Sequence, residues 1–167
     1  MTFEEIVKHH GDMVYNHCFK FTRNEETAKD LTQEIFLKIY QNLSRFREEA
    51  NIKTWIYRIT VNTNLTALNS AYAKKSKQHK SLEALLTRES SENAEEKIII
   101  EEQANNIKEA LQQLPPNDQQ IIILFYYDEL SYEEISKVMN IAKGTVGIKL
   151  YRARRKLKNI MQVSNEL

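Results

Sequence analysis

The strongest chemical signal in the sequence is a run of lysine and arginine near its end. No acidic residue occurs between Lys143 and Lys158. The basic side chains that follow Lys143 are Lys149, Arg152, Arg154, Arg155, Lys156 and Lys158. Guanidinium and ammonium groups pair with phosphate oxygens and with guanine edges, so such a cluster favours contact with nucleic acid. A basic run can also be an ordinary solvated face, so the interpretation depends on the elements that present it.

The residues around this run have the pattern of two helices joined by a tight turn. Ser131 and Glu134 have the spacing of a capping box, which begins a helix. Asn140 follows, and asparagine tolerates the left-handed backbone that a sharp turn requires. Apolar residues at helical spacing then mark a second helix: Val146, Leu150, Ala153 and Leu157. The pattern predicts a DNA-binding helix-turn-helix, and a helical hairpin with a solvated basic face is the simpler alternative.

The residue types that perform catalysis or bind metals form no comparable pattern. His9, His10, His17 and His79 have no partners at zinc-ligand spacing, and Cys18 is the single cysteine. The sequence has neither a glycine-rich phosphate loop nor a nucleophile motif. We therefore expect no enzymatic activity, no metal and no cofactor.

The composition predicts a helical protein of the cytoplasm. Its 167 residues include three glycines and two prolines, and 41% are apolar. Long periodic stretches rich in Glu, Lys, Leu, Ile and Gln favour helices. The formal charge of +1 combines the basic C-terminal run with residues 83–102, which hold seven acids and two bases. A single cysteine, with no signal peptide or membrane-spanning run, predicts a soluble intracellular protein without membrane insertion.

The apolar pattern divides the chain into two domains. Residues 1–75 contain three predicted helices, and residues 76–102 lose the apolar periodicity, so we expect a flexible linker there. Residues 103–167 form the second domain, in which Pro115-Pro116 ends one helix and Asn117 or Asp118 is expected to cap the next. The predicted fold class is all-α, with two small helical domains joined by a flexible linker and a helix-turn-helix in the C-terminal one.

Two stretches together resemble bacterial RNA polymerase sigma factors. The run DLTQEIFLKIYQNLSRF (30–46), followed by KTWIYRITVN (53–62), is similar to their second-region domain. The run LPPNDQQIIILFYYDELSYEEISKVMNIAKGTVGIKLYRARRKL (114–157) is similar to their fourth-region domain. A short chain with only these two domains resembles the extracytoplasmic-function (ECF) group. The resemblance implies promoter-specific transcription initiation, with core RNA polymerase, promoter DNA and an anti-sigma factor as partners.

The resemblance also implies roles for individual residues. Core polymerase would bind a helical surface of the first domain: Asp30, Gln33, Glu34 and Phe36. The opened −10 element would contact a loop and the helix that follows it: Arg45, Arg47, Asn51, Lys53, Trp55, Tyr57, Arg58 and Asn62. The recognition helix would read the −35 element: Lys143, Thr145, Gly147, Ile148, Lys149, Arg152 and Arg155.

Some of these assignments have competing interpretations. The polymerase-binding residues have the composition of any exposed helix surface. Trp55 falls on the apolar stripe of its helix, where a core position is the simpler interpretation. Gly147 and Ile148 depart from the family pattern, in which a lysine and a small polar residue are common. Preference at the corresponding base pairs is therefore expected to differ or to rest more on backbone shape.

Two other classes of protein fit part of the pattern. A stand-alone helix-turn-helix regulator would bind duplex DNA without polymerase. A recombinase or nuclease with a DNA-binding tail would need a nucleophile or a carboxylate cluster in its first half, and none is evident. The stretch from TQEIF to TWIYR discriminates between these classes, because a simple regulator has no need of it.

Overall fold

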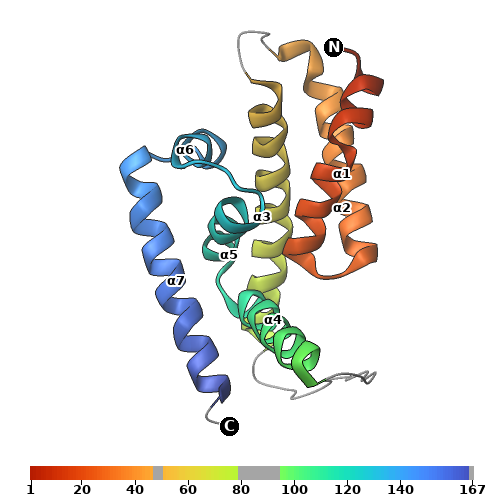
Figure 1. The fold of residues 1–167 in the computed structure, drawn as a ribbon. Coiled ribbons are helices and arrows are strands. Elements are labelled where there is room, and N and C mark those ends of the chain that lie inside the picture. The colour runs from red at the N-terminus through yellow and green to blue at the C-terminus, as the bar shows by residue number, and fades with distance from the viewer. Residues whose placement is uncertain (47–50, 79–94, 166–167) are drawn as a thin grey trace.

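The computed structural model describes residues 1–46, 51–78 and 95–165, and in these ranges the chain is helical without a strand (Figure 1). The first half contains α1 (Phe3–Thr22), α2 (Glu25–Asn42), a short 3-10 turn η1 (Leu43–Arg45) and α3 (Ile52–Gln78). The second half contains α4 (Glu95–Gln113), α5 (Pro116–Ile122), a π-helical turn η2 (Ile123–Tyr127), α6 (Tyr132–Met139) and α7 (Lys143–Asn165). The predicted all-α fold class is confirmed.

The first three helices enclose their own apolar core. Thr2 and Glu5 form a capping box that begins α1, and the Asn24 side chain accepts a hydrogen bond from the Thr27 N–H at 2.8 Å, which begins α2. The core of this half consists of buried side chains from all three helices: Ile6, Val14, Cys18, Ala28, Leu31, Ile35, Ile39 and Ile56.

The predicted helix-turn-helix is confirmed in its local detail. The Glu134 N–H donates to Ser131 Oγ at 3.2 Å, and the Ser131 N–H donates to the Glu134 carboxylate at 2.8 Å. Asn140 ends α6 in the left-handed conformation, with φ of 53° and ψ of 50°. The Ser136 hydroxyl donates to the carbonyl of Ile141 at 2.6 Å and ties the turn to α6. The apolar stripe of α7 is buried at Val146, Leu150 and Ala153.

The structure gives the helix limits around the predicted linker and at the start of α5. α3 continues to Gln78 and α4 begins at Glu95, so helices enter both ends of the predicted linker 76–102, and residues 79–94 lie outside the described residues. The prediction that Asn117 or Asp118 caps α5 is wrong, because Pro115 occupies the cap and Pro116 is the first helical residue. Proline suits that position, since its fixed φ is already helical and no N–H is needed there.

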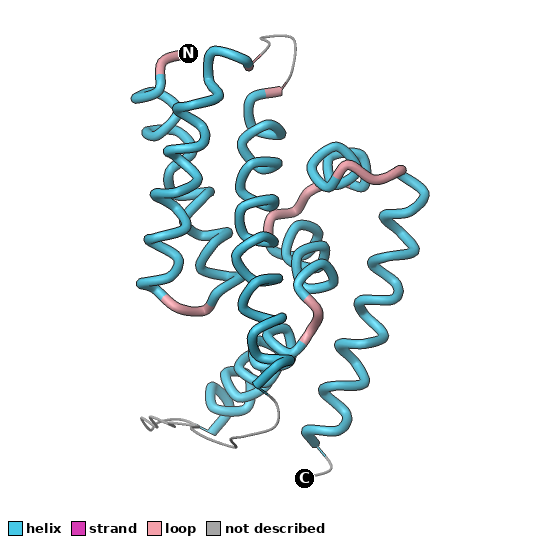
Figure 2. The backbone as a smooth tube through the Cα atoms, turned by 180° about the vertical axis from the view of Figure 1, so that it is seen from behind, coloured by secondary structure: helices cyan, strands magenta, loops and turns pink. Residues whose placement is uncertain are grey.

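The two halves pack directly against each other through α3, a contact that the sequence analysis did not address. Figure 2 shows α3 between the α1–α2 pair on one side and α5, α6 and α7 on the other. Tyr57 and Val61 of α3 belong to the same buried apolar cluster as residues of the second half. Their partners in that cluster include Leu111, Leu124, Leu130, Ile135 and Val138.

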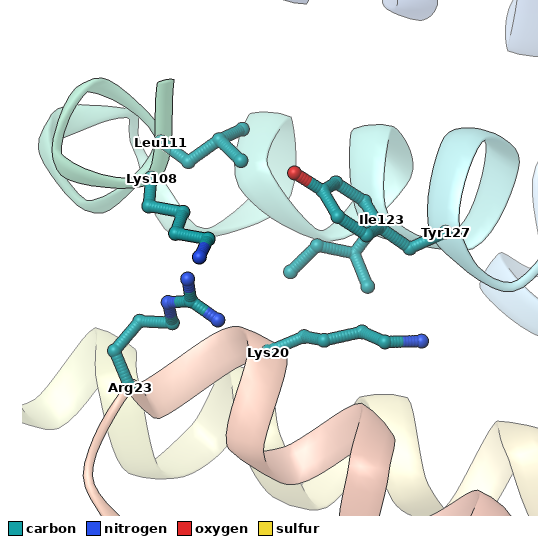
Figure 3. A pocket seen from close by; sticks show the side chains of 6 residues that line it. All are labelled: Lys20, Arg23, Lys108, Leu111, Ile123 and Tyr127. Atoms are coloured by element: carbon teal, nitrogen blue, oxygen red, sulfur yellow. The ribbon is translucent and has the colours of Figure 1, made fainter. Parts of the chain in front are cut away.

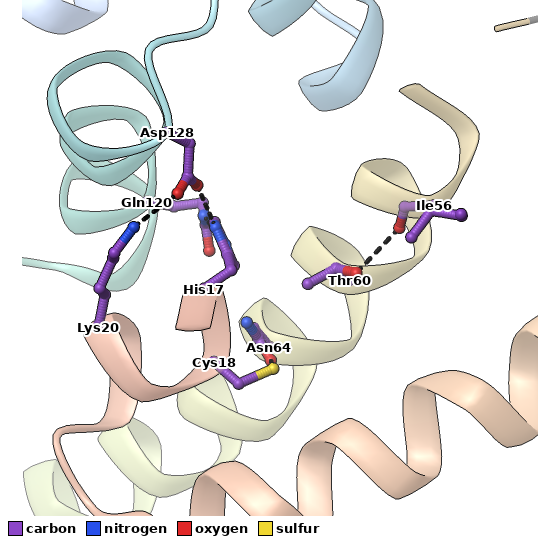
Figure 4. Close-up of polar contacts among 8 residues, drawn as sticks. All are labelled: His17, Cys18, Lys20, Ile56, Thr60, Asn64, Gln120 and Asp128. Atoms are coloured by element: carbon purple, nitrogen blue, oxygen red, sulfur yellow. Dashed lines mark hydrogen bonds and ion pairs between the residues drawn. The ribbon is translucent and has the colours of Figure 1, made fainter. Parts of the chain in front are cut away.

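A buried polar network continues this contact at α1, and we call it the interdomain seam (Figure 4). His17 is fully buried, and its Nδ1 donates to the Asp128 carboxylate. The other ring nitrogen of His17 lies 2.6 Å from the side-chain nitrogen of Gln120. Lys20 Nζ pairs with the second Asp128 oxygen at 3.0 Å. Each of these contacts joins α1 to the second half.

Side-chain amides of the second half also bind the end of α1. Gln112 and Gln119 both donate to the carbonyl of Phe21, at 3.2 and 3.0 Å. This carbonyl belongs to the last turn of α1 and has no partner within the helix. The two glutamines therefore complete the hydrogen bonding of α1 from the other side of the seam.

The charge of Asp128 is stabilised by its partners in the seam. Burial by itself would raise the pKa of Asp128, but the hydrogen bond from His17 and the ion pair with Lys20 outweigh it, so the pKa lies below its ordinary value of 3.8. The carboxylate is consequently ionised in the folded protein at neutral pH. Its loss would leave buried partners without their acceptor.

We expect Asp128→Asn to lower the free energy of unfolding by about 1.5–3 kcal/mol near neutral pH, the usual contribution of hydrogen bonds to charged groups. The folded-state pKa lies below the unfolded value of 3.8. The contribution is therefore complete above that value and is lost as the pH falls through the folded-state pKa. Urea denaturation of wild type and variant from about pH 5 to pH 3 should show a shrinking difference.

Asp12→Asn is the matched control, because Asp12 is an exposed carboxylate on the same helix. It should leave stability nearly unchanged over this range. A deficit in Asp128→Asn that stays constant across the range would show that the carboxylate charge is not what stabilises the seam.

We also expect Ser131→Ala to lower the free energy of unfolding by about 1 kcal/mol, because it removes one half of the capping box of α6. Ser70→Ala, at an exposed position within α3, makes the same chemical change away from a helix start. It should be neutral or slightly stabilising, since alanine has the higher helix propensity. Equal losses in both variants would mean that the cap contributes nothing specific.

Candidate polymerase- and DNA-binding surfaces

One face of α2 carries the predicted polymerase-binding residues. Asp30, Gln33 and Glu34 are exposed and follow the three- and four-residue spacing of a single helical face. Glu34 pairs with Lys38 of the next turn at 2.7 Å. The same face continues to Leu37, whose exposed fraction is 56%. An acidic rim beside exposed apolar side chains suits a partner with basic and apolar groups.

Phe36 lies in a different setting from the other three. It is half-buried, and its ring centroid is 6.3 Å from that of Phe3, so part of its role is to pack α2 against α1. Leu37 and Tyr40 (63% exposed) are the exposed large apolar residues of α2, and neither was predicted from the sequence to belong to this surface. In the sequence, both residues lie outside the apolar stripe by which α2 faces the core, and this position could have identified them as exposed.

The predicted −10 residues begin at the loop before α3. Asn51 caps α3, because its side-chain oxygen accepts hydrogen bonds from the N–H groups of Lys53 at 2.9 Å and Thr54 at 3.3 Å. This anchors the exposed Asn51 side chain at the helix start. Arg45 is exposed at the end of η1, and Arg47 lies outside the described residues.

Three of the predicted −10 residues share the outward side of α3. Arg58 and Asn62 are exposed and lie one helical turn apart. Trp55 is half-buried, and its ring centroid is 5.1 Å from that of Phe46, so the indole packs on the chain that precedes the loop. The position of Trp55 thus combines partial packing with partial exposure.

The other predicted −10 residues of α3 lie on the side that faces the second half. Tyr57 is 3% exposed, and burial raises its pKa, with the nearby Asp128 and Glu134 adding to the effect. The Lys53 ammonium lies 6.0 Å from the Tyr57 ring centroid. The structure therefore separates Tyr57 from the exposed Arg58 and Asn62.

The outward face of α7 carries most of the predicted −35 residues. Lys143, Arg152 and Arg155 are exposed, and Ile148 is 54% exposed. Thr145 and Lys149 are half-buried at the edges of this face. Tyr151, 57% exposed, lies on the same face and was missed, although its place off the apolar stripe was visible in the sequence.

Gly147 differs from the other predicted −35 residues because it faces α6. A Cβ at this position would lie 3.4 Å from a ring carbon of Tyr132, and α7 continues through the glycine without interruption. A Cβ at this distance would make an ordinary van der Waals contact with the ring, so the packing tolerates a small side chain and does not by itself require glycine.

Two basic side chains of α7 bind other residues of the second half. Arg154 donates to the Tyr126 hydroxyl at 3.0 Å, and Lys156 pairs with Asp118 at 2.5 Å. These contacts hold α7 against η2 and α5. The remaining basic residues on α7 have no ion-pair partner among the described residues: Lys143, Lys149, Arg152, Arg155 and Lys158.

The described residues include no group of three or more His, Cys, Asp or Glu that could hold a metal ion. Cys18 is buried, and burial raises the pKa of its thiol to about 11, so it is protonated at neutral pH and a poor nucleophile. Within the described part of the chain, no helix combines the length and apolar character needed to cross a membrane.

Comparison with known proteins agrees with this arrangement. Residues 6–73 match the family Sigma-70 region 2, and residues 104–157 match Sigma-70, region 4. RNA polymerase sigma factor YlaC of Bacillus subtilis is 29% identical over 165 residues, which cover 99% of this chain and 95% of that protein. ECF RNA polymerase sigma factor SigW of the same organism is 31% identical over 165 residues, covering 93% and 87%.

A solved structure shows the same fold. The sigma factor RpoE of Bartonella quintana, in a co-crystal structure with the anti-sigma factor NepR, superposes with a TM-score of 0.69 at 19% identity, over 96% of this chain and 97% of that one. The region 2 match argues against a stand-alone regulator. Sigma factors regulate transcription initiation and are not catalysts. Both domains in the expected order, with 31% identity over nearly all of SigW, show that this chain belongs to the ECF family of RNA polymerase sigma factors.

Proposed function

We propose that this ECF sigma factor uses three separate surfaces. The α2 face of Asp30, Gln33, Glu34 and Leu37 binds core RNA polymerase. The η1–α3 region contacts the opened −10 element, and the outward face of α7 reads the −35 element. The observation that carries the proposal is the state of α7, where exposed Arg152 and Arg155 project from a helix that capping, turn and burial hold in place.

The α7 face has the chemistry needed to read a DNA groove. An α-helix fits the major groove, arginine binds guanine edges and phosphates, and an apolar side chain can contact a thymine methyl group. Arg152 and Arg155 supply the first contact, and Ile148 supplies the second. Gly147 and Tyr132 belong to the packing behind this face, so we assign base preference to Ile148 rather than to Gly147.

Promoter binding requires the two halves to separate. The −10 and −35 elements are roughly 25 base pairs apart, or about 85 Å along DNA at about 3.4 Å per pair. A compact protein of this length has a radius of gyration of only about 15 Å. In the closed arrangement Tyr57 is also covered by the second half. Opening would expose Tyr57 to the −10 element beside Lys53, which is already exposed.

We further propose an anti-sigma factor as a partner and the cytoplasm, where core polymerase acts, as the location. The support for the partner is the shared fold with a sigma factor that was solved together with an anti-sigma factor. The ECF relatives support the location, since they are named as factors of RNA polymerase.

We expect Leu37→Ala to weaken binding to core polymerase about tenfold, equivalent to about 1.4 kcal/mol, because an apolar contact at the centre of an interface is lost. Leu37 is 56% exposed, so stability should change by no more than about 0.5 kcal/mol. Glu34→Lys should also weaken binding to core polymerase, and more strongly at low salt than at high salt, because it reverses a charge at the rim of the interface. Binding is measured with purified bacterial core polymerase by biolayer interferometry.

Glu109→Lys provides the control, since it makes the same charge reversal at an exposed position of α4. It should bind core polymerase as wild type does. If Leu37→Ala and Glu34→Lys also bind as tightly as wild type, the α2 face is not the docking surface.

We expect Arg152→Ala and Arg155→Ala each to weaken binding of the polymerase holoenzyme to promoter DNA by about 1–3 kcal/mol if they contact base edges. The loss should be larger on a promoter with an intact −35 element than on one with that element scrambled. Electrophoretic mobility shift assays at fixed salt measure both. A uniform loss on all DNA would assign the arginines to phosphates instead.

Lys156→Gln is the matched control, because it removes the same charge from α7 at a side chain that already pairs with Asp118. It should weaken promoter binding less than either arginine variant. An equal loss in all three variants would show that the outward face of α7 is not the DNA-binding face.

A further inference from the structure

A cleft at the interdomain seam, separate from the three surfaces above, brings cations from both halves together. It is lined by Lys20 and Arg23 at the end of α1, by Lys108 and Leu111 of α4, and by Ile123 and Tyr127 of η2. Figure 3 shows the ends of Arg23 and Lys108 pointing toward each other across the seam, whereas the Lys20 side chain extends away from them, below Tyr127.

Among the described residues, the two cations that face each other have no anionic partner. Asp128 pairs with Lys20, but no carboxylate among the described residues lies within ion-pair distance of Arg23 or Lys108. Like charges brought together beside buried apolar surface repel one another, and here that surface includes the fully buried Ile123. An anion between them would replace repulsion with two attractive contacts.

The fold does not otherwise account for this pair. The C-terminal end of a helix favours nearby cations, which could explain Lys20 and Arg23. Lys108 belongs to α4, so the end of its own helix does not account for its position in the cleft.

Arg23 is held in place for contact with a ligand. It ends α1 in the left-handed conformation with φ of 52°, which is uncommon for a residue other than glycine or asparagine. Its guanidinium carbon lies 5.7 Å from the Phe19 ring centroid, and this cation–π contact fixes the group at the edge of the cleft. A fixed planar guanidinium suits bidentate binding of a phosphate group.

We propose that this cleft binds a small phosphate-bearing anion, which bridges Arg23 of the first half and Lys108 of the second. The cleft is shallow, and most of its space of about 230 Å³ is open to solvent. A phosphate or diphosphate group would therefore lie at the mouth of the cleft, between the two side chains. The rest of a larger ligand, such as a nucleoside, would lie outside.

Such a ligand binds the closed arrangement only, because separation of the halves parts Arg23 from Lys108. Binding therefore stabilises the closed sigma factor and opposes promoter binding. This regulatory consequence depends on the proposed function, whereas the binding itself does not.

The test uses the full chain, without polymerase, DNA or Mg²⁺, titrated with inorganic pyrophosphate and with ADP at constant ionic strength. Isothermal titration calorimetry and the thermal midpoint report binding. We expect both ligands to bind wild type, and Arg23→Asn and Lys108→Gln to weaken binding at least about tenfold. Binding of pyrophosphate and ADP alike assigns the phosphates as the recognised group, and ADP binding without pyrophosphate binding contradicts the proposal.

If Arg23 and Lys108 had a structural role, their substitution would lower the stability of the protein without ligand, whereas the proposal predicts unchanged or higher stability. Asparagine tolerates the left-handed conformation at position 23, so Arg23→Asn removes the charge without backbone strain. Without ligand, both variants should be as stable as wild type or more so, since repulsion is relieved. Lys8→Gln, an exposed lysine at the other end of α1, should bind like wild type.

Three results would overturn the proposal. Sodium chloride at equal ionic strength could stabilise wild type as much as pyrophosphate does. The two variants could bind as tightly as wild type, or they could be less stable without ligand, which would make the cations structural.

In a separate assay, pyrophosphate should weaken promoter binding by wild-type holoenzyme but not by Lys108→Gln holoenzyme, and equal responses would exclude the bridge between the halves.

Discussion

The arrangement of this molecule depends on a charge buried between two domains. Asp128 is ionised at a site that is nearly closed to water, and it remains so because His17 and Lys20 of α1 bind its two oxygens. A buried carboxylate without such partners is costly, so the second half is held where α1 can supply them. The position of α5 and η2 on the first half follows from this pairing together with the apolar burial of Tyr57.

The seam has the character of an interface that can open. It is polar, and one of its buried groups, the side-chain oxygen of Gln120, has no hydrogen-bond partner among the described residues. Interfaces between domains that move resemble transient protein contacts, which are more polar than permanent cores. An ECF sigma factor that must reach two separate promoter elements needs such a contact, stable enough to close and weak enough to part.

The orientation of α7 has a different origin. It comes from the capping box of α6, the left-handed turn at Asn140 and the packing of Tyr132 against Gly147. Arg154 and Lys156 add contacts to η2 and α5. Basic residues on one helix therefore differ in their surroundings, because Arg154 and Lys156 contact other elements of the second half, whereas Arg152 and Arg155 are exposed on the outward face.

The sequence by itself determined the local structure and the family. The Ser131 cap, the turn at Asn140 and the stripe of α7 were predictable because each depends on residues within a few positions of one another. Tertiary structure alone decided that Tyr57 is covered, that Gly147 faces Tyr132, and that His17 meets Asp128, 111 residues away. Such contacts depend on how whole helices pack, and the spacing of residues along one helix carries no information about its partner.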